Sequence, residues 1–181
     1  VILQPRGGKL LVTELYVLQN DSDPPASYAP ARATLRFWVP EGAHRSVQAS
    51  ILGVGGIPVP LGPQPDPASS GVLGVSHALK PGENRIEVTY HLDYPGALLF
   101  ETRAAEKVER TRLAVAQGVT ATGESVRFLA TDPQMKFSIY DVAQNDSWSV
   151  KLTGEARQPE AAAGGEGAGS ERDSGITEMK S

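Results

Sequence analysis

Residues 84–90 (NRIEVTY) and 34–40 (TLRFWVP) decide the fold class of this chain, because apolar and polar residues alternate along both with a period of two. In the first stretch, Ile86, Val88 and Tyr90 share one face, while polar residues occupy the other. This is the pattern of a half-buried antiparallel strand. Both stretches therefore predict an all-β protein.

Similar runs recur along the chain and predict about twelve strands. They lie at residues 9–18, 34–40, 47–52, 57–61, 72–79, 84–90, 97–102, 111–116, 119–122, 126–129, 136–142 and 148–153. The 19 glycines and 14 prolines fall mostly between these runs, as turn residues do. Together they predict an antiparallel β-sandwich, immunoglobulin-like or similar, in which residues 9–18, apolar on both faces, form a central strand.

Two connections carry further expectations. Residues 80–83 (KPGE) have the order of a type II turn, which predicts a hairpin between the strands at 72–79 and 84–90. Residues 103–117 have helix-forming propensity, but their first part has almost no apolar face that a helix could bury. We therefore expect a charged turn at 106–110 and a strand from 111 to 116.

Length and composition limit the organisation of the chain. Its 181 residues are enough for one large core or two small ones. We expect a β-sandwich region at residues 1–155, with a sub-boundary near 104–110 if it forms two lobes, and both arrangements stay open. Residues 156–181 are of low complexity and predict a flexible tail or juxtamembrane tether. The first residue is valine, as in a piece processed or excised from a longer protein.

Composition also argues against several function classes. A net charge of −4 without any long basic run argues against nucleic-acid binding. Because the chain has no cysteine, it has neither disulfides nor thiolate metal sites. The glycines at 53–56 precede proline-rich residues rather than a helix, so they indicate a bulge or hairpin and no phosphate site. No apolar run approaches the roughly 20 residues that cross a bilayer.

Candidate site residues are few. Asp21 and Asp23 resemble the start of a calcium loop, but neither a glycine nor a closing glutamate follows at the spacing such a loop needs, and ordinary turn chemistry explains them better. His44, His77 and His91 are too scattered for a zinc site. No nucleophile or placed carboxylate pair is recognisable. We therefore expect a protein that is not an enzyme and has no cofactor.

Aromatic residues leave one alternative open. A carbohydrate-binding or adhesion module would display several rings in a solvent-exposed row on a groove or flat face. The rings available for such a row are Trp38, Tyr16, Tyr28 and Trp148. Core or sheet-face packing is the more ordinary expectation for the two tryptophans.

Four phrases of the sequence resemble one family. They are QPRGGKLLVTELYVLQN at 4–20, TLRFWVPEGA at 34–43, GGIPV at 55–59 and LKPGENRIEVTYHLDY at 79–94. This combination is similar to uncharacterised bacterial envelope proteins described as containing a carboxypeptidase-regulatory-like domain. The resemblance covers about residues 1–155, the β-sandwich region that follows a Cna-B-like domain in those proteins. The segment ERDSGI at 171–176 also resembles the stretch before their membrane helix.

The resemblance implies a location and a way of working. It implies a β-sandwich on the periplasmic or extracellular face of the bacterial cell envelope, membrane-anchored in the full-length protein, with the tail close to the membrane. The family has no catalytic residues to transfer. We therefore expect a noncatalytic protein that acts by protein contact, as an extrinsic or accessory structural subunit of a membrane-associated assembly. Its partners would be that complex or other envelope proteins, with exposed edge strands as docking surfaces.

Overall fold

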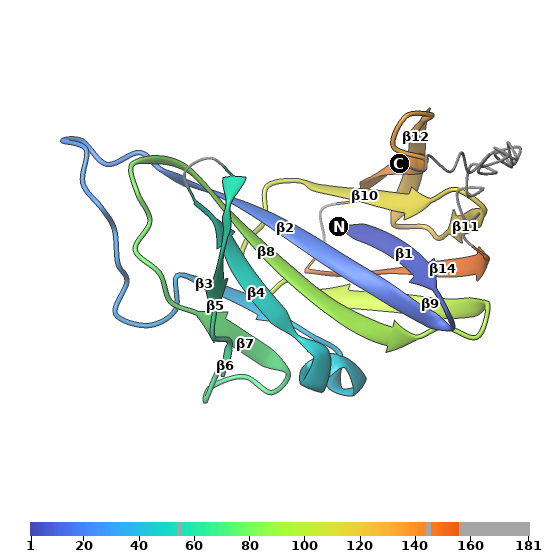
Figure 1. Cartoon of the computed structure of the whole chain (residues 1–181), viewed down its shortest axis with the longest axis horizontal. Helices are drawn as coiled ribbons and strands as arrows, with labels where there is room; N and C mark the ends of the chain where they lie inside the picture. Colours follow the sequence, from blue (N-terminus) through green and yellow to red (C-terminus); the bar gives the residue numbers. More distant parts are fainter. Residues whose placement is uncertain (54–55, 144–145, 156–181) are drawn as a thin grey trace, which may run out of the picture.

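The computed structural model describes residues 1–53, 56–143 and 146–155, which form three β-sheets (Figure 1). The strands of the largest sheet are β1 (Ile2–Arg6), β2 (Lys9–Asn20), β4 (Gln48–Leu52), β5 (Pro58–Leu61), β8 (Gly82–Asp93), β10 (Thr111–Ala116), β12 (Val126–Asp132) and β13 (Phe137–Val142). One small sheet contains β3 (Leu35–Trp38), β6 (Gln64–Pro65) and β7 (Val72–Val75), and the other contains β9 (Ala97–Arg103), β11 (Val119–Thr122) and β14 (Ser147–Gly154).

The strand orders are β12-β13-β10-β1-β2-β8-β4-β5 in the large sheet, and β3-β7-β6 and β11-β14-β9 in the small ones. All pairings are antiparallel except that of β1 with β10, where Ile2 lies opposite Ala114. The large sheet is continuous from β12 to β5, so the first strand of the chain joins early and late strands. The predicted antiparallel β-sandwich is confirmed, with one parallel pair that alternation alone does not reveal.

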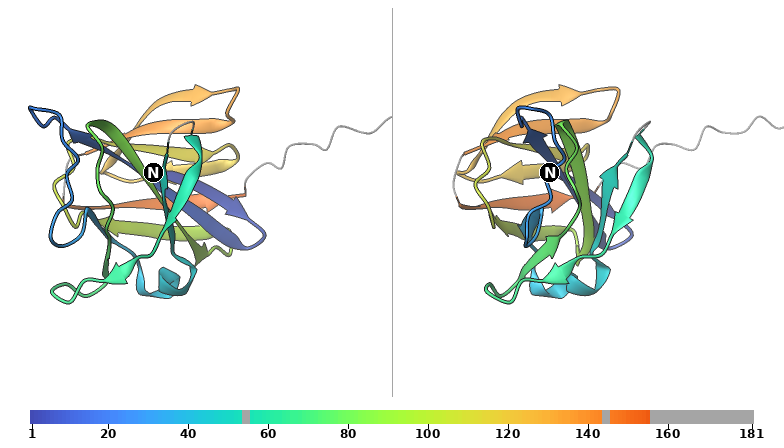
Figure 2. Two further views of the ribbon diagram at one scale, coloured as in Figure 1. Left: turned by 60° about the vertical axis from the view of Figure 1, so that its left-hand side comes forward. Right: turned by 90° about the vertical axis from the view of Figure 1, so that its left-hand side faces the viewer.

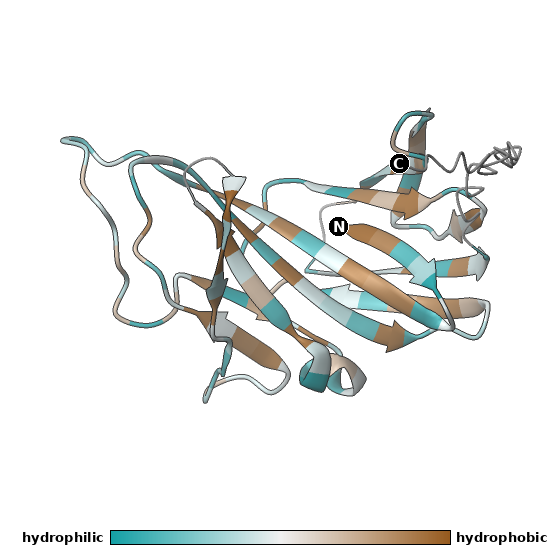
Figure 3. Cartoon of the chain, in the orientation of Figure 1, coloured by the Kyte–Doolittle hydropathy of each residue, from teal (hydrophilic) through white to brown (hydrophobic). Residues whose placement is uncertain are grey.

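Strands β2 and β8 form the spine of the molecule. They pair over their full length, from Lys9 opposite Asp93 to Asn20 opposite Gly82, and run diagonally through the centre of Figure 1. Figure 3 shows apolar and polar residues alternating along both strands. On β2 the buried face includes Leu10 and Val12. The predicted central position of this strand is confirmed.

Both small sheets cover the buried face of the spine. Tyr16 of β2 lies 6.4 Å from Phe37 of β3 between ring centroids, and Leu10 and Val12 share one buried cluster with Phe100 of β9. Figure 2 shows the C-terminal strands, yellow to orange, on one side of the spine and β4 and β5 on the other. The core is therefore continuous, with one small sheet over each end of the large one.

Most strand predictions are confirmed. Residues 111–116 form β10, as expected from the weak apolar face of 103–117, and residues 119–122 form β11. The hairpin expected around residues 53–56 is present between β4 and β5. Three elements were not predicted: β1, the two-residue strand β6, and a 3-10 helix at Glu41–Ser46.

The predicted hairpin between residues 72–79 and 84–90 is wrong. β7 belongs to a small sheet, where Leu73 lies opposite Phe37, whereas β8 belongs to the large sheet. The turn itself exists, with Gly82 at φ +90° and the Asn84 side chain donating to the Lys80 carbonyl at 2.8 Å. It carries the chain between sheets, because alternation identifies a strand but not its partner. The predicted tail at residues 156–181 lies outside the described residues.

Candidate functional site

The candidate calcium residues lie in the exposed loop after β2. Asp21 accepts a hydrogen bond from the Gln19 side chain at 2.9 Å, and Asn20 donates to the Ala26 carbonyl at 2.9 Å. These contacts are turn chemistry. Within residues 1–53, 56–143 and 146–155, no three or more His, Asp or Glu side chains gather as metal ligands would, and Asp21 and Asp23 are no exception. The three histidines lie apart: His44 is on the 3-10 helix, His77 in the connection between β7 and β8, and His91 on β8.

The four aromatic rings considered for a carbohydrate platform do not form an exposed row. Trp148 is only 9% exposed and packs against Phe100, with ring centroids 5.6 Å apart. Trp38 is half-buried beneath the guanidinium of Arg103, which lies 5.4 Å from the ring centroid. Tyr16 is half-buried too, and only Tyr28 is well exposed. This geometry gives the carbohydrate alternative no aromatic platform.

One edge of the large sheet is closed by proline. The Gly53 amide donates to the Ile57 carbonyl at 2.9 Å, so the backbone groups of Ile57 face β4. Because these groups alternate along a strand, those of Pro58 and Pro60 face outward. Proline has no N–H to offer a further strand. This edge therefore resists strand addition.

The opposite edge, β12, pairs with β13 on one side and with no described strand on the other. It contains no proline, and its pairing with β13 slips by one residue, so that Leu129 is an extra, bulged residue between Phe128 and Ala130. The Ala143 amide donates to the Ser125 carbonyl at 2.8 Å, so the backbone groups of Ser125 face β13. Because these groups alternate in direction, those of Phe128, three residues later, face outward. An extended segment could thus pair with this edge up to the bulge.

Large apolar side chains accompany this open edge. Phe128 is 55% exposed, Leu129 is 41% exposed, and Met135 in the following turn is 66% exposed. We call these three residues and the outer backbone of β12 the β12 edge. It combines unpaired main-chain groups with apolar side chains, the two features that strand-addition surfaces use.

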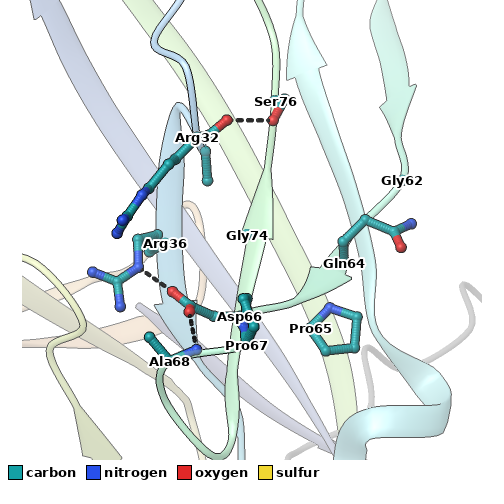
Figure 4. Close-up of a pocket in the computed structure, with 11 residues that line it drawn as sticks. Arg32, Arg36, Gly62, Gln64, Pro65, Asp66, Pro67, Ala68, Gly74 and Ser76 are labelled. Carbon is teal, nitrogen blue, oxygen red and sulfur yellow. Dashed lines mark hydrogen bonds and ion pairs between the residues drawn. The ribbon is translucent and has the colours of Figure 1, made fainter.

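A pocket of about 480 Å³ lies over the outer side of the β3–β7–β6 sheet (Figure 4). We call it the outer-face pocket. Arg36 of β3 donates through Nε to Asp66 Oδ2 at 2.5 Å and through a terminal nitrogen to Ser69 Oγ at 3.3 Å. The hydrogen bond from the Ala68 amide and, to a smaller extent, the Arg36 guanidinium hold the pKa of Asp66 below its ordinary value. Asp66 is thus charged at neutral pH and orients Arg36.

The strand register places a glycine at the floor of the outer-face pocket. Arg36, Gly74 and Gln64 lie opposite one another on three successive strands. A Cβ added to Gly74 would lie 2.8 Å from the Cβ of Ala33, closer than two carbons approach. Glycine at this position therefore makes room for the Ala33 methyl group to pack over β7.

A buried carboxylate marks the middle of the spine. Glu14 is 4% exposed on the apolar face of β2, where Tyr16 donates to one oxygen and Tyr90 donates to the other at 2.8 Å. Burial raises the pKa of Glu14, while the two tyrosine bonds lower it. Burial and the nearby Glu14 charge raise the pKa of both tyrosines. The phenols therefore remain donors at neutral pH.

A second pocket, of about 320 Å³, opens beside Glu14. Its walls include Tyr16, Thr102, Arg103 and Lys107. The pocket lies where β2 runs beyond its last pairing with β1, Thr13 opposite Ile2. The buried acid and its tyrosines have all their polar atoms paired, which identifies a structural hydrogen-bond centre.

Sequence reasoning missed both the outer-face pocket and Glu14. A signal existed for Glu14, because it is the one charged residue on the inward face of β2, between Val12 and Tyr16. No comparable signal existed for the pocket, whose charged residues come from the segment before β3, from β3 itself and from the loop after β6.

Comparisons with protein-family models, curated proteins and solved structures find no match to this chain. Over the described residues, no helix has the length and apolar character needed to cross a membrane.

Proposed function

We propose that this chain is a noncatalytic β-sandwich that acts by protein contact, as an extrinsic or accessory structural subunit of a membrane-associated assembly in the bacterial cell envelope. The observation that carries the proposal is the contrast between the two edges of the large sheet. Prolines close β5, whereas β12 offers, beside Phe128 and Leu129, backbone groups with which no described strand pairs. Edges left open in this way are docking surfaces or aggregation hazards.

The partner segment at this edge would be an extended stretch of another protein. Main-chain hydrogen bonds to β12 would supply affinity, and apolar side chains against Phe128, Leu129 and Met135 would supply specificity. The envelope location and the membrane-bound partner follow from the sequence resemblance, and the tail at residues 156–181 would act as the tether.

The test is made in native envelope membranes under mild detergent, by size fractionation, cross-linking and mass spectrometry. We expect the full-length protein to co-migrate in fixed stoichiometry with a larger complex and to cross-link through the β12 edge. Leu129→Lys should weaken co-migration, because a charge on an edge strand opposes strand addition and apolar contact. Ile57→Lys is the matched control, since Ile57 is 68% exposed beside the proline-closed edge.

Thermal unfolding of each variant establishes that it is folded. Migration of the wild-type protein alone would overturn the proposal. Equal loss of co-migration in Leu129→Lys and Ile57→Lys would retain an accessory role but reject the β12 edge as its contact surface.

A further inference from the structure

The outer-face pocket has a chemistry of its own, separate from the β12 edge. It lies on the small sheet formed by β3, β7 and β6, whereas β12 is the far edge of the large sheet. Arginine, apolar residues and a glycine floor meet there. This combination is typical of a small-ligand site, in which mostly apolar walls surround a few placed polar groups.

Two guanidinium groups border the outer-face pocket. Arg36 uses two of its five N–H donors on Asp66 and Ser69, so the others are available. The side chain of Arg32 makes no ion pair or hydrogen bond with any described residue. Figure 4 shows both guanidinium groups on the same side of the pocket. A ligand there would meet the remaining donors of Arg36, which Asp66 already holds in place.

The net charge of the outer-face pocket is complementary to a ligand with one negative charge. Arg32 and Arg36 contribute two positive charges and Asp66 one negative charge, which leaves a net charge of one positive unit. A carboxylate would balance that charge, whereas a phosphate dianion would exceed it. Guanidinium also binds a planar carboxylate through paired N–H donors.

Apart from Gln64 and Ser76, the rest of the outer-face pocket is lined by small or apolar residues. Ala33, Pro65, Pro67 and Ala68 line it, together with the floor at Gly74. Its volume of about 480 Å³ falls in the range of small-ligand sites, roughly 300–1,000 Å³. It therefore fits an apolar body attached to the charged group better than a bare ion.

We propose that the outer-face pocket binds a carboxylate carried on a small apolar body, with Arg32 and Arg36 as the anion contacts and the proline and alanine side chains around the body. The ligand is either a free carboxylic acid or the C-terminal residue of a peptide, because both present the same chemical group.

The experiment is an amide NMR titration of the 181-residue chain with N-acetyl-leucine. We expect saturable shifts at Ala33, Ala68 and Gly74. N-acetyl-leucinamide, which lacks the charge, and inorganic phosphate, which lacks the apolar body, should each bind at least about tenfold more weakly. Arg32→Gln should weaken N-acetyl-leucine binding about tenfold or more, since it removes a charge-assisted donor from an exposed position. Arg45→Gln, an exposed arginine on the 3-10 helix, is the matched control.

An acetylated hexapeptide ending in leucine distinguishes the two sources of the carboxylate. Tighter binding of the peptide identifies a peptide terminus, and equal binding identifies a free acid. Three results would overturn the proposal: equal binding of the amide, equal binding of phosphate, or no saturable shift up to ~10 mM, where affinity is negligible. Because Arg32 lies far in the fold from the β12 edge, none of these results bears on the partner contact.

Discussion

Replacing Glu14 with glutamine is expected to change how stability depends on pH without preventing folding. The side chain is 4% exposed and lies between the hydroxyls of Tyr16 and Tyr90. Glutamine has the same shape, and its amide can accept from one phenol and donate to the other. The substitution therefore removes a buried charge while it keeps the hydrogen-bond centre filled.

The direction of the pH effect follows from burial. Since burial raises the pKa of Glu14 above its ordinary value of 4.5, the folded protein keeps a proton that the unfolded chain has already lost. The stability contributed by this group is fully present below pH 4.5 and is lost as the pH rises through the pKa of the folded state. Over that window the wild-type free energy of unfolding falls relative to Glu14→Gln, by at most about 1.4 kcal/mol per pH unit.

The hydrogen bonds to Glu14 give this effect an internal control. Tyr90→Phe removes the donor at 2.8 Å and should cost about 1–3 kcal/mol, with a larger cost where Glu14 is charged. Tyr94→Phe removes a hydroxyl that donates to the Gly154 carbonyl at 2.9 Å and does not contact Glu14. Its cost should not follow the Glu14 titration.

The assay is urea unfolding of wild type and the three variants, at pH steps from about 4 to 8, followed by tryptophan fluorescence. Subtraction of Glu14→Gln from wild type cancels the groups that titrate equally in both. A difference that stays constant over the whole range, or that grows in favour of wild type as the pH rises, would refute the assigned pKa direction and its cause.

Three other perturbations have expected outcomes. Replacing Pro58 and Pro60 with threonine should open the β5 edge, and analytical ultracentrifugation should then detect concentration-dependent association that wild type does not show. Gly154→Ala should lower the free energy of unfolding in urea by about 2–4 kcal/mol, because φ is +106° and the new Cβ would lie 2.4 Å from a backbone oxygen. Gly96→Ala is its control and should cost less, because Gly96 has φ +97° but open space around the new Cβ. Trp148→Ala should cost about 3–5 kcal/mol by thermal or urea unfolding, since the ring is buried in the core.

Strand positions were predictable because alternation reports burial directly. In β8 the buried residues Ile86, Val88 and Tyr90 are the apolar positions of the sequence pattern, and β10 and β11 have the predicted boundaries. β1 escaped prediction because Pro5 interrupts a short run of mixed polarity. Its strand character comes from pairing with β2 on one side and β10 on the other, which is tertiary information.

The outer-face pocket was not predictable for a related reason. Of its charged residues, Arg32 and Arg36 are close in sequence, but Asp66 lies 30 positions after Arg36, beyond β4 and β5, and each alone resembles an ordinary surface residue. Only the register that aligns Arg36 with Gly74 and Gln64 brings them to one face. The spacing of residues along the sequence does not determine that strand register.

The two edges of the large sheet end in different strands, β5 and β12. At the β5 edge, outward prolines close the large sheet, while the outer-face pocket lies on the separate β3–β7–β6 sheet. At the β12 end, the bulge at Leu129 limits the open edge to a short stretch before it. A short open edge suits one specific partner segment better than unlimited stacking, since stacking requires a long, flat edge. The bulge thus restrains the aggregation hazard at the edge where the β12 contact is proposed, as the prolines do at the other.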